Sequence, residues 1–500
     1  MYTIAAHQDL PPLIQALCRP EAWPHPVDTV RVIETHSAWV LLTGRYAYKI
    51  KRPVQLGFTD FSTLAKRRSA CEQELQLNRR HASALYDSIV KICGEESEPV
   101  VLDIDNEDGT AIEYAVKMRE FQQSQQLDRQ LLAGQIDFGD MDELAAMVAE
   151  LHISAPASPP DSLYGSVEHI TQPALRIFDD LEPLIDDSAD LLTIDKLREW
   201  TSTRAEQLAP VMTRRKQDHF VRECHGDMHL SNIAAFEGKF VPFDCIEFDA
   251  DLRWRDVMSE VAFLTMDLAA RKRIDLAWRF LNRYLELSGD YGGATMLRFY
   301  IVFATMARAR VAAIRAEQTP PGTELYAEIA RAYRMHLALA ETAVRPRTPV
   351  IILTMGASGS GKAWLTSRLL SALPAIRIRS DIERRRLHGI GETQKNEADI
   401  AKGIYSEQLS REIYEYLRDR TQDIITARLD VIIDATFLRR EQRELFYELG
   451  NQNNCPVVIL DCHAEDRVLR DRIRQRKWDG ADGSEIDEAV LKFQQKSLEP

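Results

Sequence analysis

Alternating apolar and polar positions predict β-strands in the first quarter of the chain, and apolar residues at helical spacing predict helices after it. The segments with strand character are residues 30–33, 39–42, 46–51, 89–90, 100–102 and 111–118, and one helix is predicted among them at 64–81. Residues 141–152 place Leu144, Met147, Val148 and Leu151 on one helical face, so His152 is expected in the core or at a helix end. Further helices are predicted through an insert ending near residue 216 and on to about residue 343.

A different pattern follows a Pro- and Arg-containing linker at residues 345–349. Residues 350–355, 431–436 and 457–462 are short continuous apolar runs, which are typical of strands buried on both faces of a parallel sheet. Five hundred residues also exceed one ordinary hydrophobic core, so two or three domains are expected. We predict an α+β domain at residues 1–345 and an α/β domain at residues 346–500.

The segment at residues 46–51 carries two lysines on one strand face. Period-two alternation places Lys49 and Lys51 on one side and Tyr48 and Ile50 on the other. An inward-facing lysine is costly unless it is paired, which favours a phosphate-binding role. The alternative is an edge strand with two solvent-facing lysines.

Residues 224–232 have the pattern of a phosphoryl-transfer loop. His225 precedes Asp227 by two residues, and Asn232 follows Asp227 by five. In such a loop the aspartate accepts the proton of an attacking hydroxyl, and the asparagine oxygen ligates magnesium. Asp244 ends a short apolar run and supplies a second carboxylate for the metal. The expected cofactors are ATP and Mg²⁺.

His225, Gly226, Asp227, His229 and Asn232, with Asp244 downstream, resemble the signature of the aminoglycoside phosphotransferase and choline kinase group. That group shares the protein-kinase fold, so the resemblance implies a bilobal front domain. Its small lobe would span about 27–121 and its large lobe about 122–345. The reaction it implies is transfer of a phosphoryl group from ATP to a hydroxyl of a small molecule.

The same resemblance assigns residues of the small lobe. An Ala-x-Lys pattern selects Lys49 over Lys51, and a Glu of the next helix, Glu74 rather than Glu72, is expected to hold it. Met118 closes the strand before residues 119–121, the expected hinge where backbone groups hold adenine.

Two other front-domain features leave alternatives open. Residues 34–38 form a hairpin tip without glycine, where Thr35 and Ser37 either contact nucleotide phosphates or make a plain turn. The helical insert is acidic, which in the resembled family holds a cationic substrate, although solvated helix faces are equally acidic. Its acidic residues are Asp179, Asp180, Glu182, Asp186, Asp187 and Asp190.

A P-loop follows the strand predicted at 350–355. Its residues are Gly356, Ser358, Gly359, Ser360, Gly361 and Lys362, and a helix is predicted at 363–373. Backbone N–H groups and the helix N-terminus wrap phosphates in this arrangement, and the lysine reaches the outer ones. The Ser or Thr that normally follows the lysine and binds magnesium is Ala363 here. Phosphate binding is expected to persist, whereas magnesium positioning is in question.

The rest of the second domain resembles the polynucleotide kinase, gluconate kinase and zeta-toxin group. Asp381, expected to end a second strand, would face the accepting hydroxyl, and Asp434 is a Walker-B-like metal residue. Arg472 and Arg476, one helical turn apart, are the lid arginines expected to reach the transferring phosphate; the alternative is a solvated basic face.

Composition also indicates which class of protein this chain belongs to. The chain is 45% hydrophobic and 28% charged, and it lacks a run of about 20 apolar residues. The first residues lack the basic start and apolar core of a signal peptide. Seven scattered cysteines without a C-x-x-C pair indicate reduced thiols and no disulfide partner, so a cytoplasmic protein is expected. The net charge of −14 resides mostly in the first domain, which disfavours nucleic acid as its partner.

The whole chain resembles bacterial fusions of an aminoglycoside phosphotransferase-like domain with an ATP-binding P-loop domain. The sequence therefore predicts a bifunctional ATP-dependent phosphotransferase. In a second interpretation the P-loop domain binds nucleotide without turnover and regulates the front kinase. In a third it is the main enzyme and acts on a nucleotide or polynucleotide end. The chain stops at Pro500 without an obvious closing element, so its last helix is expected to be trimmed.

Overall fold

The computed structural model of the protein describes residues 3–4, 10–56, 59–389, 407–479 and 488–499. Its contacts divide the chain into two compact units. The first unit contains residues 1–136, 154–164 and 219–255, and the second contains 137–153, 165–218 and 256–500. These limits differ from the boundary expected at residue 345, and the division of the chain into domains at that residue stays a prediction.

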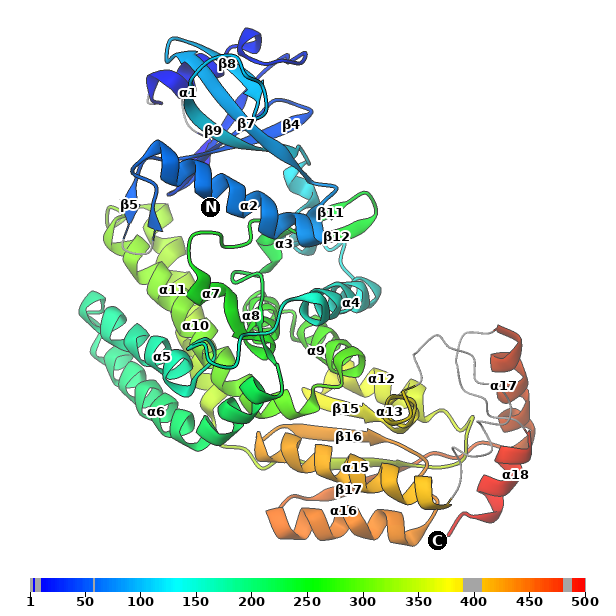
Figure 1. Ribbon diagram of the computed structural model, residues 1–500. Helices are drawn as coiled ribbons and strands as arrows, with labels where there is room; N and C mark the ends of the chain where they lie inside the picture. Colours follow the sequence, from blue (N-terminus) through cyan, green and yellow to red (C-terminus); the bar gives the residue numbers. More distant parts are fainter. Residues whose placement is uncertain (1–2, 5–9, 57–58, 390–406, 480–487, 500) are drawn as a thin grey trace. The chain divides into compact units, whose positions relative to one another are not determined.

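A seven-stranded antiparallel sheet is the centre of the first unit (Figure 1). Its strand order is β1-β2-β3-β4-β9-β7-β8. The strands are β1 (Thr3–Ile4), β2 (Arg31–Glu34), β3 (Ala38–Leu42), β4 (Tyr46–Lys51), β7 (Tyr86–Glu95), β8 (Glu98–Asp103) and β9 (Ala111–Arg119). Tyr48 and Ile50 of β4 pack with Ile14 and Leu17 of α1 (Pro12–Leu17). Tyr48 and Ile50 therefore share one apolar face of β4, as the alternation predicts.

Helix α2 (Leu64–Ala82) packs on β7 and β9. It begins at Thr63, whose side-chain oxygen accepts a hydrogen bond from the Lys66 backbone N–H. This cap satisfies one of the N–H groups that a helix start leaves without a partner. The smaller elements of this unit are β5 (Gln55–Leu56), β6 (Thr59–Asp60), α3 (Leu127–Leu132), β10 (Val221–Glu223), β11 (Ile233–Phe236), β12 (Lys239–Pro242), α7 (Ala250–Arg253) and β13 (Trp254–Asp256).

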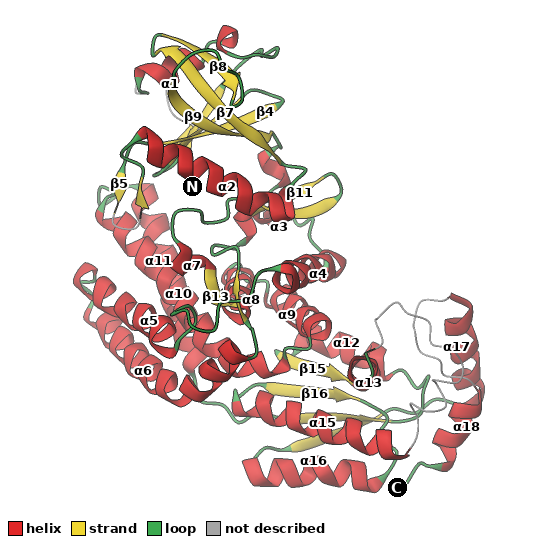
Figure 2. Ribbon diagram, in the orientation of Figure 1, coloured by secondary structure: helices red, strands yellow, loops and turns green. Residues whose placement is uncertain are grey.

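Long helices make up the first part of the second unit (Figure 2). They are α4 (Phe138–Ser154), α5 (Val167–Leu181), α6 (Ser188–Gln217), α8 (Val257–Ala270), α9 (Ile274–Ser288), α10 (Ala294–Glu317) and α11 (Glu324–Val344). Arg215 of α6 contacts both Asp256 and Asp290, with its Nε 2.7 Å from Asp256 Oδ2 and its Nη1 2.7 Å from Asp290 Oδ1. All three side chains are buried, so this cluster fixes α6 to the start of α8 and the end of α9.

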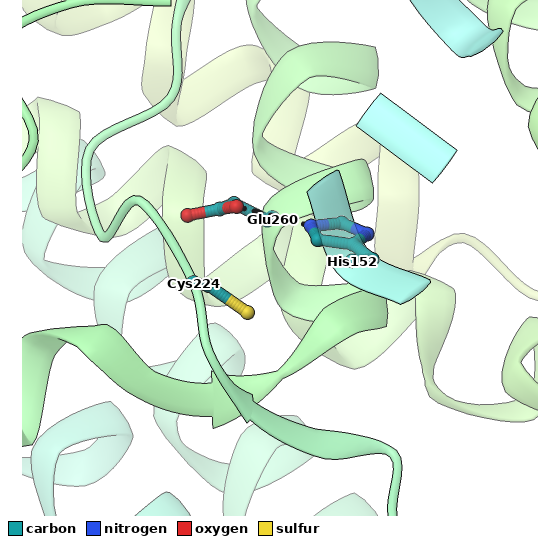
Figure 3. Close-up of side chains that lie close together, drawn as sticks. All are labelled: His152, Cys224 and Glu260. Atoms are coloured by element: carbon teal, nitrogen blue, oxygen red, sulfur yellow. Dashed lines mark hydrogen bonds and ion pairs between the residues drawn. The ribbon is translucent and has the colours of Figure 1, made fainter. Parts of the chain in front are cut away.

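His152 lies inside the same helical region, as its apolar surroundings in the sequence predict. Its Nε2 is 3.1 Å from Glu260 Oε2 on α8 (Figure 3). Its Nδ1 is 2.9 Å from the Tyr284 hydroxyl on α9. Both His152 and Glu260 are buried. His152 therefore joins three helices through polar contacts within the core.

A parallel sheet with the order β15-β16-β14-β17 forms the rest of the second unit. Its strands are β14 (Ile351–Met355), β15 (Ala375–Arg379), β16 (Asp430–Asp434) and β17 (Val457–Asp461). The helices with it are α12 (Lys362–Ala372), α13 (Ser380–Leu387), α15 (Glu407–Thr426), α16 (Arg440–Asn453), α17 (Asp466–Asp479) and α18 (Glu488–Lys496). Ile351 of β14 and Val431 of β16 are fully buried, as their continuous apolar runs predict. The run at 457–462 differs from the prediction, because β17 is an edge strand and Val458 is 44% exposed.

The predicted fold class is confirmed by these two arrangements, an antiparallel sheet with helices and a parallel sheet with a P-loop. The second strand of the parallel sheet differs from the prediction, because it ends at Arg379 and Asp381 lies in the first turn of α13. Acidic side chains in a first turn interact favourably with the helix dipole, which accounts for this earlier helix start. Within the described residues, no helix is both long and apolar enough to cross a bilayer.

Candidate active sites

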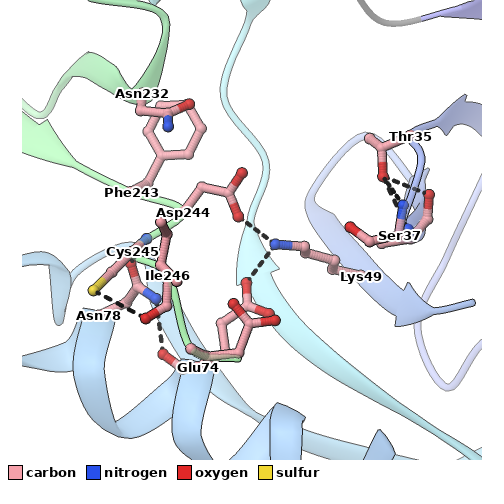
Figure 4. Close-up of polar contacts among 12 residues, drawn as sticks. Thr35, Ser37, Lys49, Glu74, Asn78, Asn232, Phe243, Asp244, Cys245 and Ile246 are labelled. Carbon is pink, nitrogen blue, oxygen red and sulfur yellow. Dashed lines mark hydrogen bonds and ion pairs between the residues drawn. The ribbon is translucent and has the colours of Figure 1, made fainter. Parts of the chain in front are cut away.

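Three segments of the first unit meet at Lys49. The Lys49 Nζ lies 2.8 Å from Glu74 Oε1 of α2, and it also pairs with Asp244 in the loop after β12 (Figure 4). Glu74 is fully buried and Lys49 nearly so. Burial alone would lower the pKa of Lys49, but Asp244 and Glu74 raise that pKa well above its ordinary value. Lys49 is therefore a fixed positive charge between two carboxylates.

Lys51 is even more buried than Lys49, and it pairs with a carboxylate that Lys49 does not contact. It pairs with Glu74 and with Glu247, and its side chain is 1% exposed. Burial raises the pKa of Glu247, and Lys51 opposes that rise. The alternative of two solvent-facing lysines does not match this geometry. Glu72, the glutamate that the sequence interpretation passed over, instead pairs with Arg68 on the exposed side of α2.

The backbone around Asp244 is held in an uncommon conformation. Asp244 has φ of 64°, in the left-handed region that aspartate tolerates better than most residues. Its N–H donates to the Tyr86 hydroxyl at 3.0 Å, and the Cys245 N–H donates to Asn78 Oδ1 at 3.0 Å (Figure 4). Burial would raise the pKa of Asp244, but Lys49 lowers it to about 2. The carboxylate is therefore ionised and its backbone is fixed.

The loop at residues 224–232 brings Asp227 and Asn232 together. Asn232 Nδ2 donates to the Asp227 backbone oxygen at 3.0 Å and to Asp227 Oδ2 at 3.3 Å. His229 Nε2 lies 3.4 Å from Asp227 Oδ2, and His225 Nε2 lies 2.9 Å from the Phe243 oxygen. Asn232 is buried while the Asp227 side chain is 41% exposed. The Asp227 carboxylate is therefore open to solvent and is contacted by the buried Asn232.

Gly226 has a steric reason to be glycine. Its φ is 90°, and a Cβ there would lie 3.1 Å from the Leu252 backbone oxygen and 3.3 Å from Ile246 Cδ1. A side chain would therefore strain the loop directly before Asp227.

The donor set of this site fits magnesium. Asn232 uses its amide nitrogen toward Asp227, so its carbonyl oxygen is the atom suited to ligation, and Asp244 adds an ionised carboxylate. Carboxylate and amide oxygens are the hard ligands that Mg²⁺ takes in proteins. The residues present are therefore compatible with a nucleotide-bound magnesium ion.

The other small-lobe candidates lie as follows. Residues 34–38 form the hairpin between β2 and β3, and the Thr35 hydroxyl exchanges hydrogen bonds of 2.9 Å with the Ala38 backbone (Figure 4). The Ser37 N–H donates to Thr35 Oγ1 at 3.4 Å. Met118 lies in β9, opposite Ala47 and next to the predicted hinge. The Thr35 hydroxyl thus stabilises the turn itself.

Three of the six acidic residues of the insert have arginine partners. Asp179 and Glu182 pair with Arg198, and Asp180 Oδ2 lies 2.6 Å from Arg310 Nη1. These carboxylates stabilise contacts among the helices α5, α6 and α10.

The P-loop in the second unit connects β14 to α12. Gly356 has φ of 136°, and a Cβ there would lie 2.3 Å from the Cys462 backbone oxygen, so only glycine fits. Gly359 and Gly361 also have positive φ. Lys362 Nζ donates to the carbonyls of Gly356 at 2.8 Å and Ala357 at 2.9 Å. The Lys362 side chain therefore lies across the P-loop, the loop expected to bind phosphates.

The remaining P-loop residues bond to their neighbours. The Ser358 N–H donates to Gln494 Oε1 at 2.8 Å, and Ser360 N–H donates to the Ala357 oxygen at 3.2 Å. Arg472 of α17 donates from Nη1 to the Gly359 oxygen at 2.9 Å, which brings this arginine to the loop. Arg476 belongs to α17, but its side chain lies outside the described residues.

Two acidic candidates follow neighbouring strands of the parallel sheet. Asp434 ends β16 and is 8% exposed, and its Oδ2 accepts a hydrogen bond of 2.8 Å from the Thr366 hydroxyl. Asp381 accepts 2.8 Å from Arg379 Nη2. Burial raises the pKa of Asp434, and Arg377 opposes that rise. Sequence reasoning missed Thr366 and Arg377, because neither belongs to a P-loop motif.

Relatives of this chain span nearly all of it. An uncharacterized protein of Mycobacterium tuberculosis is 29% identical over 484 residues, which cover 94% of this chain and 92% of the relative. A protein of Mycobacterium bovis, also described as uncharacterized, matches to the same extent.

Several solved structures are similar to parts of the chain. A gluconokinase from Sinorhizobium meliloti is 20% identical, covers 31% of this chain and 78% of its own, and has a TM-score of 0.22. An ethanolamine kinase from Plasmodium vivax is 11% identical, with coverages of 63% and 82% and a TM-score of 0.38. A putative aminoglycoside phosphotransferase from Ralstonia eutropha is 14% identical, with coverages of 66% and 96% and a TM-score of 0.37.

One family model matches part of the chain. Residues 351–500 match the family described as an AAA domain. This segment contains the four parallel strands, the glycine-rich loop and Lys362. The P-loop domain predicted from the sequence in this part of the chain is thereby confirmed.

Proposed function

We propose that the residues around Lys49 and Asp227 form an ATP-dependent phosphotransferase site whose acceptor is a hydroxyl of a small molecule. The observation that carries this proposal is the contact of Lys49 with both Glu74 and Asp244. Residues from β4, α2 and the loop after β12 converge there, although Lys49 and Asp244 are 195 positions apart. A lysine fixed between a helix glutamate and a metal-type aspartate is the arrangement that kinases use for ATP phosphates.

In this site most of the catalysis is positioning. Lys49 neutralises charge on the nucleotide phosphates, and Glu74 fixes its position. Asp227 accepts the hydrogen bond of the acceptor hydroxyl and then its proton, and Asn232 holds Asp227 in place from the buried side. Bound magnesium, ligated by Asn232 and Asp244, would supply positive charge to the transferring phosphate. Thr35, Ser37 and Met118 are proposed to border the nucleotide.

The P-loop forms a second proposed nucleotide site. The backbone of residues 356–361 and Lys362 bind the phosphates, Asp434 supports the metal through water, and Asp381 faces an acceptor. Arg472 contacts the loop and is proposed, with Arg476, to reach the transferring phosphate. The acceptor classes are a small hydroxyl compound, with cationic compounds included, for the first site and a nucleotide or polynucleotide end for the second.

A second candidate function rests on Ala363. Without a hydroxyl directly after Lys362, the P-loop is less suited to hold magnesium for turnover. In this interpretation the P-loop domain binds nucleotide and regulates the front kinase.

ATP consumption with magnesium distinguishes these functions. ATP consumption by the full chain is compared with that of the Asp227→Asn and Lys362→Ala variants. Each protein is assayed with aminoglycosides, amino alcohols, sugars and nucleosides as acceptors. Loss of separate activities in the two variants supports a bifunctional enzyme. Loss in Asp227→Asn alone supports the regulatory interpretation. Loss in Lys362→Ala alone contradicts the assignment of the front site as an enzyme.

A further inference from the structure

Thr366 of α12 is the hydroxyl nearest in the chain after Ala363 on the P-loop helix. It lies three residues after Ala363, which on an α-helix is about 60° around the axis and roughly 4.5 Å along it. Its side chain is fully buried, and its Oγ1 lies 2.8 Å from Asp434 Oδ2 and 3.2 Å from the Ala363 backbone oxygen. Asp434, the Walker-B-like carboxylate, is therefore hydrogen-bonded to a hydroxyl that lies one helical turn after position 363, where the P-loop motif normally has its Ser or Thr.

Arg377 contacts the Thr366 hydroxyl as well. Arg377 of β15 is 4% exposed, and its Nη1 lies 3.3 Å from Thr366 Oγ1 and 2.9 Å from Ser367 Oγ. A guanidinium only donates, so the Thr366 oxygen is the acceptor in that contact. The hydroxyl proton is then available to Asp434, whose oxygen is nearer than that of Ala363.

Arg377 is held in turn by α9. Its Nη2 lies 2.6 Å and its Nε 3.2 Å from Glu286 Oε1, and Glu286 is 5% exposed. Asn282, one turn before Glu286, accepts the Arg377 backbone N–H at 2.7 Å and donates to the Ala375 oxygen at 2.9 Å. A chain of contacts thus leads from α9 through β15 and α12 to Asp434.

Glu286 and Arg377 also border an open cleft of about 380 Å³. Its other lining residues are Asp142, Glu143, Ala146, Arg279, Arg283, Ser367 and Arg379. Glu286 contacts Arg377 and not Thr366 or Asp434, so a change at Glu286 perturbs the network farther from Asp434 than a change at Thr366 does.

We propose that Thr366 replaces the hydroxyl missing at position 363 by orienting Asp434 toward a nucleotide-bound divalent cation, with Arg377 and Glu286 as further positioning residues. Because Oδ2 of Asp434 is bonded to Thr366, Oδ1 is the oxygen that would interact with a bound cation. The proposal rests on nucleotide binding by the P-loop. Removing groups that orient a metal-binding carboxylate typically costs about 10- to 100-fold in metal affinity.

The test measures Mn²⁺ binding by electron paramagnetic resonance at saturating ATP. The full chain carries Asp244→Asn, which removes the front metal site, and a fluorescent ATP analogue without metal reports nucleotide affinity. Thr366→Val removes the hydroxyl at constant shape, and Thr366→Ser retains it. Thr366→Val is expected to weaken Mn²⁺ binding about tenfold or more with nucleotide affinity unchanged, whereas Thr366→Ser stays close to the parent.

Glu286→Gln is the second variant, in case Thr366→Val does not fold. It is also expected to weaken Mn²⁺ binding, by a smaller factor than Thr366→Val does. Mn²⁺ affinity unchanged in both variants, or an equal loss in Thr366→Ser and Thr366→Val, would overturn the proposal, because the hydroxyl would then have no role. Absence of Lys362-dependent ATP binding in the parent would instead refute the nucleotide site itself.

Discussion

Replacing Lys51 by methionine is expected to destabilise the protein strongly, whereas replacing Lys49 is expected to remove activity at little cost in stability. The two lysines share a strand face and both contact Glu74. Lys51 is the cation that contacts Glu247, whose side chain is 5% exposed. Lys49 instead contacts Asp244, whose side chain is 40% exposed and can be solvated. The variants therefore separate a structural lysine from the nucleotide lysine.

The magnitude follows from the carboxylate that Lys51→Met leaves behind. Removing one partner of a buried ion pair costs about 3–5 kcal/mol. Glu247 can escape part of that cost by protonation. Bringing a proton to it at pH 7 from its ordinary pKa of 4.5 costs about 3.4 kcal/mol at 1.36 kcal/mol per unit. The expected loss is therefore about 3 kcal/mol, or roughly 6–12 °C in unfolding temperature. For Lys49→Met a smaller loss is expected, because Glu74 keeps Lys51 as its cation and the Asp244 side chain is 40% exposed.

Thermal unfolding of both variants between pH 5 and 8 measures this difference. In Lys51→Met the folded state keeps a proton on Glu247 that the unfolded state releases above pH 4.5. The stability of the variant therefore falls as pH rises, and its gap to the wild type widens by about 1.4 kcal/mol per unit. The double variant Lys51→Met/Glu247→Met removes the uncompensated carboxylate and is expected to recover most of the loss.

Equal unfolding temperatures for Lys51→Met and the wild type would refute this account of the buried cluster. A gap that does not change with pH would show that Glu247 is not the group left without a cation. Full ATP consumption by Lys49→Met would contradict its assignment to the nucleotide.

Three further changes have direct expectations. Arg215→Met leaves two buried aspartates without their cation and is expected to cost about 3–5 kcal/mol, measured by denaturant unfolding; an unchanged midpoint would contradict it. Burial and Arg308 lower the pKa of His336 to about 4, so the folded state resists the proton that the unfolded state binds below about pH 6.5. Stability is therefore expected to fall from pH 6.5 toward 4, by at most about 2 kcal/mol at pH 5, and His336→Phe should flatten this slope in unfolding scans. Gly356→Ala pushes a Cβ against the Cys462 oxygen and is expected to abolish fluorescent-ATP binding at the P-loop, with Gly322→Ala, in open space, as the exposed-glycine control for positive φ.

Much of this architecture is readable in the sequence, because the signals are local. Alternation along residues 46–51 predicts that Lys49 and Lys51 share a face, and the apolar runs before Gly356 and Asp434 predict strands of a parallel sheet. The helix predicted at residues 64–81 is observed as α2 at Leu64–Ala82, with Thr63 as its cap. Local periodicity and capping carry this information.

The ion-pair and hydrogen-bond partners of the buried charged residues could not be predicted from local sequence patterns. The choice between Lys49 and Lys51 came from a motif, and nothing near Lys51 in the chain indicates that its second carboxylate lies 196 positions away. Thr366 looks like an ordinary residue of an amphipathic helix, and its bond to Asp434 depends on how β16 is placed beside α12. Pairings of this kind are set by tertiary packing.

The side chain of Asn282 forms hydrogen bonds with the backbone of β15 at the edge of the parallel sheet. β15 is an edge strand, and edge strands offer unpaired backbone groups to other chains. Asn282 bonds to the Arg377 N–H and the Ala375 oxygen on that edge, in the way that another strand would. Cutting the chain at residue 345 would remove α9 and expose this edge together with Arg377. A fragment of residues 346–500 would therefore be open to self-association through β15, and the helices before it protect the sheet from aggregation.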